Sequence, residues 1–183
     1  IVSDGDLMEG ITSEAASLAG TLKLGKLIYL YDDNHITIEG DTSQAFTENV
    51  QQRFDSYGWH TQRVEDGNNT EKIEEAVKNA RGESGRPSLI IIRTHIGYGS
   101  PKQDTAEVHG EPLGENNARL TKEFYGWKNE PFFVPDEALA RFREAVCRGE
   151  KAEKAWDAKL ADYAKAYPEQ AAALEAWTKG VLR

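Results

Sequence analysis

Short apolar runs alternate with stretches of helical periodicity through the first half of the chain. A continuous apolar run is typical of a buried strand whose two sheet faces are both covered. Apolar residues at three- and four-residue spacing indicate amphipathic helices. The pattern predicts strands at residues 1–3, 27–31, 59–64 and 89–92, and helices at 10–24, 47–57 and 70–81. This alternation predicts an α/β fold, a mostly parallel sheet with flanking helices, and Gly25 is expected to end the first long helix.

The pattern changes after Thr94. Residues 96–113 show no periodicity, and a loop of this length in a compact domain is usually functional. From Asn117 the chain is helical again, and its aromatic residues at three- and four-residue spacing favour packing over a cofactor box. We expect an α/β domain at 1–133, followed by a helical C-terminal segment at 134–183 that leads to a next domain absent from this chain.

Composition narrows the class of protein. The chain has 183 residues and a formal net charge of −9, which argues against a nucleic-acid surface. No apolar run approaches the roughly 20 residues of a membrane span. The single cysteine, Cys147, allows no disulfide within the chain and favours a reducing compartment. We therefore expect a cytoplasmic protein, or a plastid one if its parent carries a transit peptide, with no nucleic-acid or membrane partner.

Polar residues follow the first two predicted strands. Asp4 and Gly5 come directly after residues 1–3, and Asn34 and Ile36 follow the second strand. In open parallel sheets, ligands bind at the carboxyl ends of strands. Asp and Asn oxygens with a nearby backbone carbonyl are hard ligands suited to Mg²⁺ or Ca²⁺. The pattern indicates a cation site that would hold a diphosphate, although Asp4 alone is also a common helix cap and Asn34 a common turn residue.

Asp4-Gly5, with Asn34 at the end of the next strand, resembles the thiamine diphosphate motif, in which Ser3 here replaces the first Gly. Other short sequence segments also resemble transketolases, and they follow one another in the same order as in that family. They stand at residues 4–20, 22–28, 31–38, 57–59, 96–100, 109–110 and 112–113, and the tail at 163–168 is also similar to the end of a first transketolase domain. The resemblance implies the thiamine diphosphate-binding fold, present here in part.

The resemblance assigns the cation and cofactor roles residue by residue. Asp4 and Asn34 match side chains that bind the metal, and Ile36 matches the residue that lends its backbone carbonyl. Asn34 also reaches the diphosphate, as does the N–H of Gly5. The implied cofactors are thiamine diphosphate and Mg²⁺, with Ca²⁺ or Mn²⁺ as alternatives.

Further matches surround this set. Ile38 and Ile96 match apolar residues beside the thiazolium and diphosphate. His109 matches a catalytic His that contacts both diphosphate and substrate, as expected of a group that titrates near neutral pH. Glu9 and Glu14 match carboxylates near the two-fold interface of a homodimer. His35 and His60 are expected to be structural, and His95 to pack beside the site.

The resemblance implies transfer of a two-carbon ketol unit from a ketose phosphate to an aldose phosphate, as in the pentose phosphate pathway or Calvin cycle. Ile1 runs directly into the site, so we expect a fragment lacking the start of its domain and the later domains. In the family, a second domain of the partner subunit binds the aminopyrimidine, and we therefore expect this chain alone to be inactive.

Two other interpretations stay open at this point. One is another thiamine diphosphate enzyme, such as a deoxyxylulose phosphate synthase or a 2-oxo acid dehydrogenase component. The other is a non-catalytic fragment with a structural or binding role. Dinucleotide binding is disfavoured because no Gly-x-Gly-x-x-Gly follows a strand. Ala106, where many relatives carry a second His, and Glu111, where a small residue is common, depart from the family pattern.

Overall fold

The computed structural model describes residues 1–181. The chain divides into two compact units, one of residues 1–129 and one that begins at Glu130. Whether these units correspond to the domains expected at 1–133 and 134–183 stays a prediction. None of the helices within residues 1–181 is both long and apolar enough to cross a membrane.

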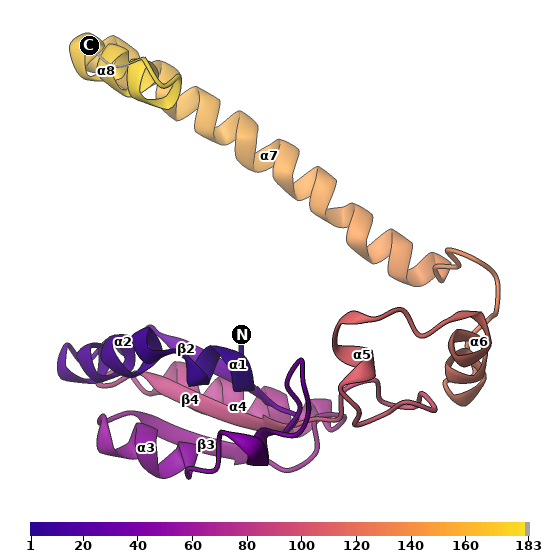
Figure 1. Ribbon diagram of the computed structural model, residues 1–183. Helices are drawn as coiled ribbons and strands as arrows, with labels where there is room; N and C mark the ends of the chain where they lie inside the picture. The colour runs from indigo at the N-terminus through magenta and orange to yellow at the C-terminus, as the bar shows by residue number, and fades with distance from the viewer. Residues whose placement is uncertain (182–183) are drawn as a thin grey trace. The chain divides into compact units, whose positions relative to one another are not determined.

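The first unit is built on a four-stranded parallel sheet. Its strands are β1 (Val2–Ser3), β2 (Ile28–Asp33), β3 (His60–Val64) and β4 (Ser88–Arg93), in the order β1-β2-β4-β3 (Figure 1). All three strand pairs are parallel. The predicted α/β class and parallel sheet are confirmed.

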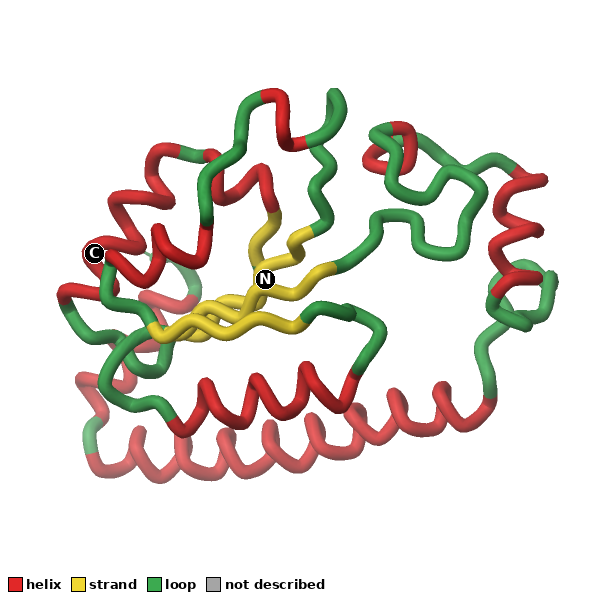
Figure 2. Tube along the Cα trace, turned by 90° about the horizontal axis from the view of Figure 1, so that it is seen from below, coloured by secondary structure: helices red, strands yellow, loops and turns green. Residues whose placement is uncertain are grey.

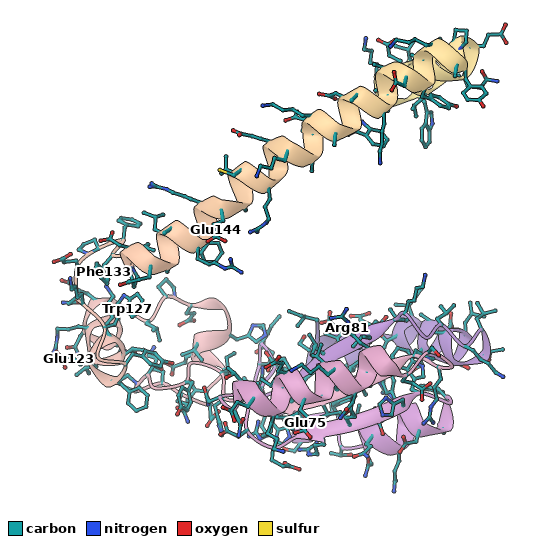
Figure 3. The ribbon with its side chains drawn as sticks, turned by 180° about the vertical axis from the view of Figure 1, so that it is seen from behind. Glu75, Arg81, Glu123, Trp127, Phe133 and Glu144 are labelled. Carbon is teal, nitrogen blue, oxygen red and sulfur yellow. The ribbon has the colours of Figure 1, made fainter. Side chains whose placement is uncertain are left out.

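Helices cover both faces of the sheet, as Figure 2 shows. On one face lie α1 (Asp4–Met8), α2 (Gly10–Thr21) and α3 (Val50–Ser56), and on the other lies α4 (Thr70–Gly82). Exposed charged side chains of α4 include Glu75 and Arg81, which lie on different sides of the helix (Figure 3).

The apolar run of β4 is buried on both sides because alternate side chains enter different cores. Leu89 and Ile91 pack in one core with Tyr31, Phe54 and Trp59. Ile90 and Ile92 pack in the other against α4. The indole N–H of Trp59 donates a hydrogen bond to the Ala16 carbonyl at 2.8 Å, which fixes α2 to the first core.

The end of α2 differs from the prediction. The helix stops at Thr21, and Lys23, with φ of 53°, is the left-handed residue. The prediction that Gly25 ends the helix is therefore wrong. Gly25 serves a close approach instead, because a Cβ there would lie 2.0 Å from the Ser84 carbonyl oxygen.

The remaining elements of the first unit are short. The 3₁₀ helix η1 (Thr42–Gln44) follows an antiparallel bridge between Ile36 and Asp41. The predicted irregular stretch at 96–113 is mostly turns, with one short helix, α5 (Glu107–Gly110). Helix α6 (Glu115–Phe124) follows it.

The second unit contains α7 (Asp136–Ala166) and α8 (Pro168–Thr178), with Pro168 in the first turn of α8. A cavity of about 660 Å³ between these helices is lined by apolar side chains that include Trp156 and Leu160. Phe142 and Val146, nearer the start of α7, are exposed. Within the second unit, the predicted packing of Trp156 and Leu160 is thus made against α8.

Candidate cation and diphosphate site

Asp4 is the first residue of α1 and directly follows β1. Asp4 is buried, with 1% of its surface exposed. Tyr31 Oη donates a hydrogen bond to Asp4 Oδ1 at 2.5 Å, and the His35 N–H donates to Oδ2 at 3.1 Å. Burial raises the pKa of the Asp4 carboxyl above its usual range, and these hydrogen bonds offset only part of that rise.

No salt bridge to Asp4 occurs among the residues that the structure describes. The neighbouring Asp33, by contrast, pairs with Arg63 Nη2 and with His35 Nε2, each at 3.1 Å. A buried carboxylate without a cationic partner is costly when ionised. A divalent cation would supply the missing charge, so Asp4 fits a cation ligand.

The turn after β2 comes directly to Asp4. His35 has φ of 66°, a left-handed conformation that is uncommon for a residue with a side chain. The Oδ1 atom of Asn34, which is 8% exposed, accepts a hydrogen bond from the Ile36 N–H at 2.8 Å. The structure thus places the 34–36 turn against Asp4, as the strand-end argument expected.

The predicted cation ligands Asp4, Asn34 and Ile36 stay a prediction. No group of three or more His, Cys, Asp or Glu side chains within residues 1–181 is arranged to hold a metal ion. The predicted set is not a group of that kind, because it combines one carboxylate with an amide oxygen and a backbone carbonyl. Such mixed oxygen sets suit Mg²⁺ and Ca²⁺.

Sequence reasoning missed the polar residues that support this edge. Arg93 Nη1 donates to the Asp33 carbonyl at 2.8 Å, and the Thr94 hydroxyl donates to the Asp32 carboxylate. Tyr31 and Asp33 were also missed. Two positions separate them along a strand, so both lie on one face of the sheet. This spacing was the sequence signal from which they could have been found.

A cavity of about 540 Å³ opens beside Asp4. Tyr31, Asp33, His35 and Arg63 line it, together with part of the 41–51 segment. Asn34 and Ile36 are not among its lining residues. The cavity therefore meets the 34–36 turn at His35, beside Asp4.

The other predicted site residues do not line this cavity. Gly5 lies in α1 with open space where a Cβ would stand, and Ile38 is 72% exposed. His109 lies exposed in the last turn of α5, and no hydrogen bond or ion pair in the described part of the chain joins it to Asp4. Glu9 and Glu14 are exposed. The roles of all these residues stay predictions.

The loop that carries Ile96 is tied at its base. The Asp104 N–H donates to the Ile96 carbonyl at 3.0 Å. His95 Nδ1 lies 2.9 Å from Asp104 Oδ2, so His95 has a specific polar partner beyond the packing role expected from the sequence. Asp104 has φ of 58°, a conformation that Asp tolerates better than most residues.

Comparison with known proteins gives the family. A family model described as "Transketolase, thiamine diphosphate binding domain" matches residues 1–183. The chain belongs to this family. The resemblance to transketolases is confirmed, and so is the thiamine diphosphate-binding fold.

Individual transketolases are similar throughout the chain. The transketolase of Geobacillus stearothermophilus is 54% identical over 185 residues, covering 100% of this chain and 28% of that protein. The transketolase of Aquifex aeolicus is 50% identical over 175 residues, covering 96% of this chain and 25% of that protein. The chain thus spans about a quarter of the length of these transketolases.

Solved transketolase structures have the same fold. A transketolase variant from Pichia stipitis in complex with fructose 6-phosphate is 42% identical with a TM-score of 0.81, covering 99% of this chain and 27% of that one. The transketolase of Leishmania mexicana is 41% identical with a TM-score of 0.81, covering 98% of this chain and 27% of that one.

Proposed function

We propose that this chain is the part of a transketolase that holds the diphosphate of thiamine diphosphate through a divalent cation. The observation that carries the proposal is Asp4, a buried carboxylate without a salt bridge among the described residues, hydrogen-bonded to the turn that contains Asn34 and Ile36. The family match over the whole chain supports the same cofactor.

In this proposal Asp4, Asn34 and the Ile36 carbonyl hold Mg²⁺, or Ca²⁺ or Mn²⁺ in its place. The Gly5 N–H contacts the diphosphate. The cation neutralises phosphate charge that the acidic strand ends would otherwise repel. When bound, thiamine diphosphate supplies the carbon nucleophile that breaks and forms carbon–carbon bonds, while the protein orients the cofactor.

The remaining residues serve the substrate and the cofactor ring. Ile38, which is 72% exposed, is free to form an apolar contact with the thiazolium, and Ile96 provides another. His109 contacts the diphosphate and transfers a proton at a sugar hydroxyl, a role suited to imidazole. Its exposure on α5 leaves the ring accessible to a substrate.

We propose a two-carbon ketol transfer between sugar phosphates, as in the pentose phosphate pathway, in the cytoplasm. The similar Pichia stipitis transketolase was crystallised with fructose 6-phosphate, which supports sugar phosphates as the substrate class. The bacterial origin of the similar transketolases supports the cytoplasm.

A homodimer is part of the proposal. Ile11 and Leu18 of α2, and Leu22 directly after it, are each more than half exposed. An exposed apolar stripe of this kind marks an interaction surface. Glu9 and Glu14 are exposed at the start of α2 and within it, so they are available to the same interface.

Calorimetric titration of the chain with thiamine diphosphate and Mg²⁺ tests the binding proposal. We expect cation-dependent binding by wild type and its loss in Asp4→Ala. A chain that binds neither ligand would support a structural module instead. Because a second domain supplies the other half of the site in the family, we expect no ketol transfer by the chain alone, and measurable transfer would contradict that expectation.

A further inference from the structure

Arg53 of α3 contacts the carboxyl end of α1, the short helix that begins at Asp4. Its Nη2 atom donates a hydrogen bond to the Leu7 carbonyl at 3.0 Å, across 46 positions of the chain. The last carbonyls of a helix have no partner within that helix, so the guanidinium satisfies an acceptor that α1 cannot satisfy itself. The side chain of Leu7 packs in the core that contains Phe46 and Phe54. The backbone and the side chain of Leu7 are therefore both fixed.

The guanidinium of Arg53 is itself fixed on several sides. Nη1 pairs with Glu48 Oε1 at 2.6 Å, and the side chain is 17% exposed. The Cζ atom lies 5.7 Å from the ring centroid of Phe46 and 5.5 Å from that of Phe54. The Nε–H is buried and has no hydrogen-bond partner among the described residues. An unpaired buried donor is unfavourable, so contacts with Leu7, Glu48 and the two rings set the position of this group.

The short length of α1 transmits this contact to Asp4. The helix has five residues, little more than one turn, so a shift of the Leu7 carbonyl also moves the backbone of Asp4. We propose that Arg53 is a positioning residue for the Asp4 carboxylate, which it fixes through α1 at the place where the cation and the diphosphate bind. The inference rests on the proposed cation site and adds a residue that touches neither ligand.

Arg53→Lys tests the contact with Leu7. Lysine keeps the positive charge and an aliphatic stem that packs on the two rings, but its ammonium is a single point and cannot reach two acceptors as the planar guanidinium does. Hydrogen bonds to a charged acceptor are the stronger ones, so the ammonium stays with Glu48 and the Leu7 contact is lost. Glu48→Gln in the same chain removes that competition and frees the lysine for Leu7.

Gln62→Met is the matched control. Gln62 Nε2 donates to the Ala76 carbonyl at 2.9 Å, so it also joins a side chain to a helix carbonyl, but in α4 on the opposite face of the sheet. Each variant is titrated calorimetrically with thiamine diphosphate and Mg²⁺, and thermal unfolding reports its stability. The NMR shift of the His35 amide proton, which donates to Asp4, reports the position of the carboxylate without any ligand.

We expect Arg53→Lys to shift the His35 amide signal and to weaken cofactor binding roughly 10-fold, the lower end of the usual effect of losing a group that orients a metal ligand. Arg53→Lys combined with Glu48→Gln recovers most of the affinity, while Glu48→Gln alone and Gln62→Met bind as wild type does. If Arg53→Lys loses stability but binds as tightly as wild type, Arg53 only stabilises the fold and the inference is overturned. A double variant that binds no better than Arg53→Lys overturns it too.

Two further outcomes are separable. If wild type binds no cofactor, the proposed function falls and this inference falls with it, whereas normal binding by wild type with an unchanged His35 signal in Arg53→Lys overturns this inference alone. If Arg53→Lys does not fold, wild type decides. By linkage, a contact that favours cofactor binding is strengthened when the cofactor binds. We therefore expect the Arg53 guanidinium protons to exchange more slowly with solvent after thiamine diphosphate and Mg²⁺ are added, and unchanged exchange would contradict the inference.

Discussion

The backbone N–H of His35 donates a hydrogen bond to the carboxylate of Asp4 across 31 positions of the chain. This bond joins the end of β1 to the turn after β2, so the two parts of the candidate cation site meet through a main-chain group. The imidazole of His35 has a separate partner, Asp33, at 3.1 Å. The amide and the side chain therefore have different tasks.

His35→Gly and His35→Val separate these tasks. Glycine keeps the amide and adopts a positive φ readily, so we expect cation-dependent cofactor binding to survive. Valine keeps the amide but is strained at a φ of 66°, at a cost of about 1–3 kcal/mol in the free energy of unfolding, with weaker binding. Urea unfolding and calorimetry measure both quantities. Equal binding losses in the two variants would show that the imidazole is what matters.

Gly20 tests the close packing of α2 against the backbone that follows α3. A Cβ at this position would lie 1.8 Å from the Tyr57 carbonyl oxygen, a backbone atom that cannot move aside. We expect Gly20→Ala to lower the free energy of unfolding by roughly 3 kcal/mol, the upper part of the usual range for overpacking. Gly10→Ala in the same helix is the control, since no atom lies within 4 Å of its Cβ position. Equal stability of the two variants would contradict the predicted clash.

Asp104 gives the loop at 95–104 a pH dependence. Burial raises the pKa of its carboxyl, but hydrogen bonds from His95 and Gln103 outweigh burial, and the pKa lies below its usual range. A carboxyl with a lowered folded-state pKa adds stability above its unfolded pKa of about 4, and that stability is lost as the pH falls through the folded pKa. We expect the residue 104 amide to lose hydrogen-exchange protection over this acidic window.

Asp104→Asn is the control for that measurement, because Asn tolerates the left-handed backbone and does not titrate. Its amide should show no loss of protection specific to this window. The same acid-dependent loss in wild type and in Asp104→Asn would assign the effect to other carboxyl groups.

Much of the first unit could be predicted because its signals are local. The run at 89–92 is buried on both faces, as a continuous apolar segment requires, and the side chains alternate between two cores. Asp4 and Asn34 could be predicted as neighbours because the carboxyl ends of parallel strands meet at one edge. Neither conclusion depends on a particular long-range side-chain contact.

Tyr31 and Asp33 could not be identified in the same way. Their spacing shows that they share a face, but their partners depend on register. The partner of Tyr31 follows from the pairing of Val2 with Tyr31, and Asp33 reaches Arg63 from a strand on the far side of β4. The prediction of where α2 ends was wrong for a related reason. The glycine at position 25 is needed for the close approach to Ser84 rather than for a helix cap.

The central claim is that Asp4 and the 34–36 turn hold one cation that carries the diphosphate. Substitution of Mn²⁺ for Mg²⁺ tests it most directly, because the paramagnetic ion broadens NMR signals only near its binding site. We predict that thiamine diphosphate with Mn²⁺ removes the amide signals of Gly5 and Ile36 and the side-chain amide of Asn34, while Mg²⁺ leaves them visible. Tight cofactor binding with these signals intact, or broadening centred elsewhere in the chain, would contradict the claim.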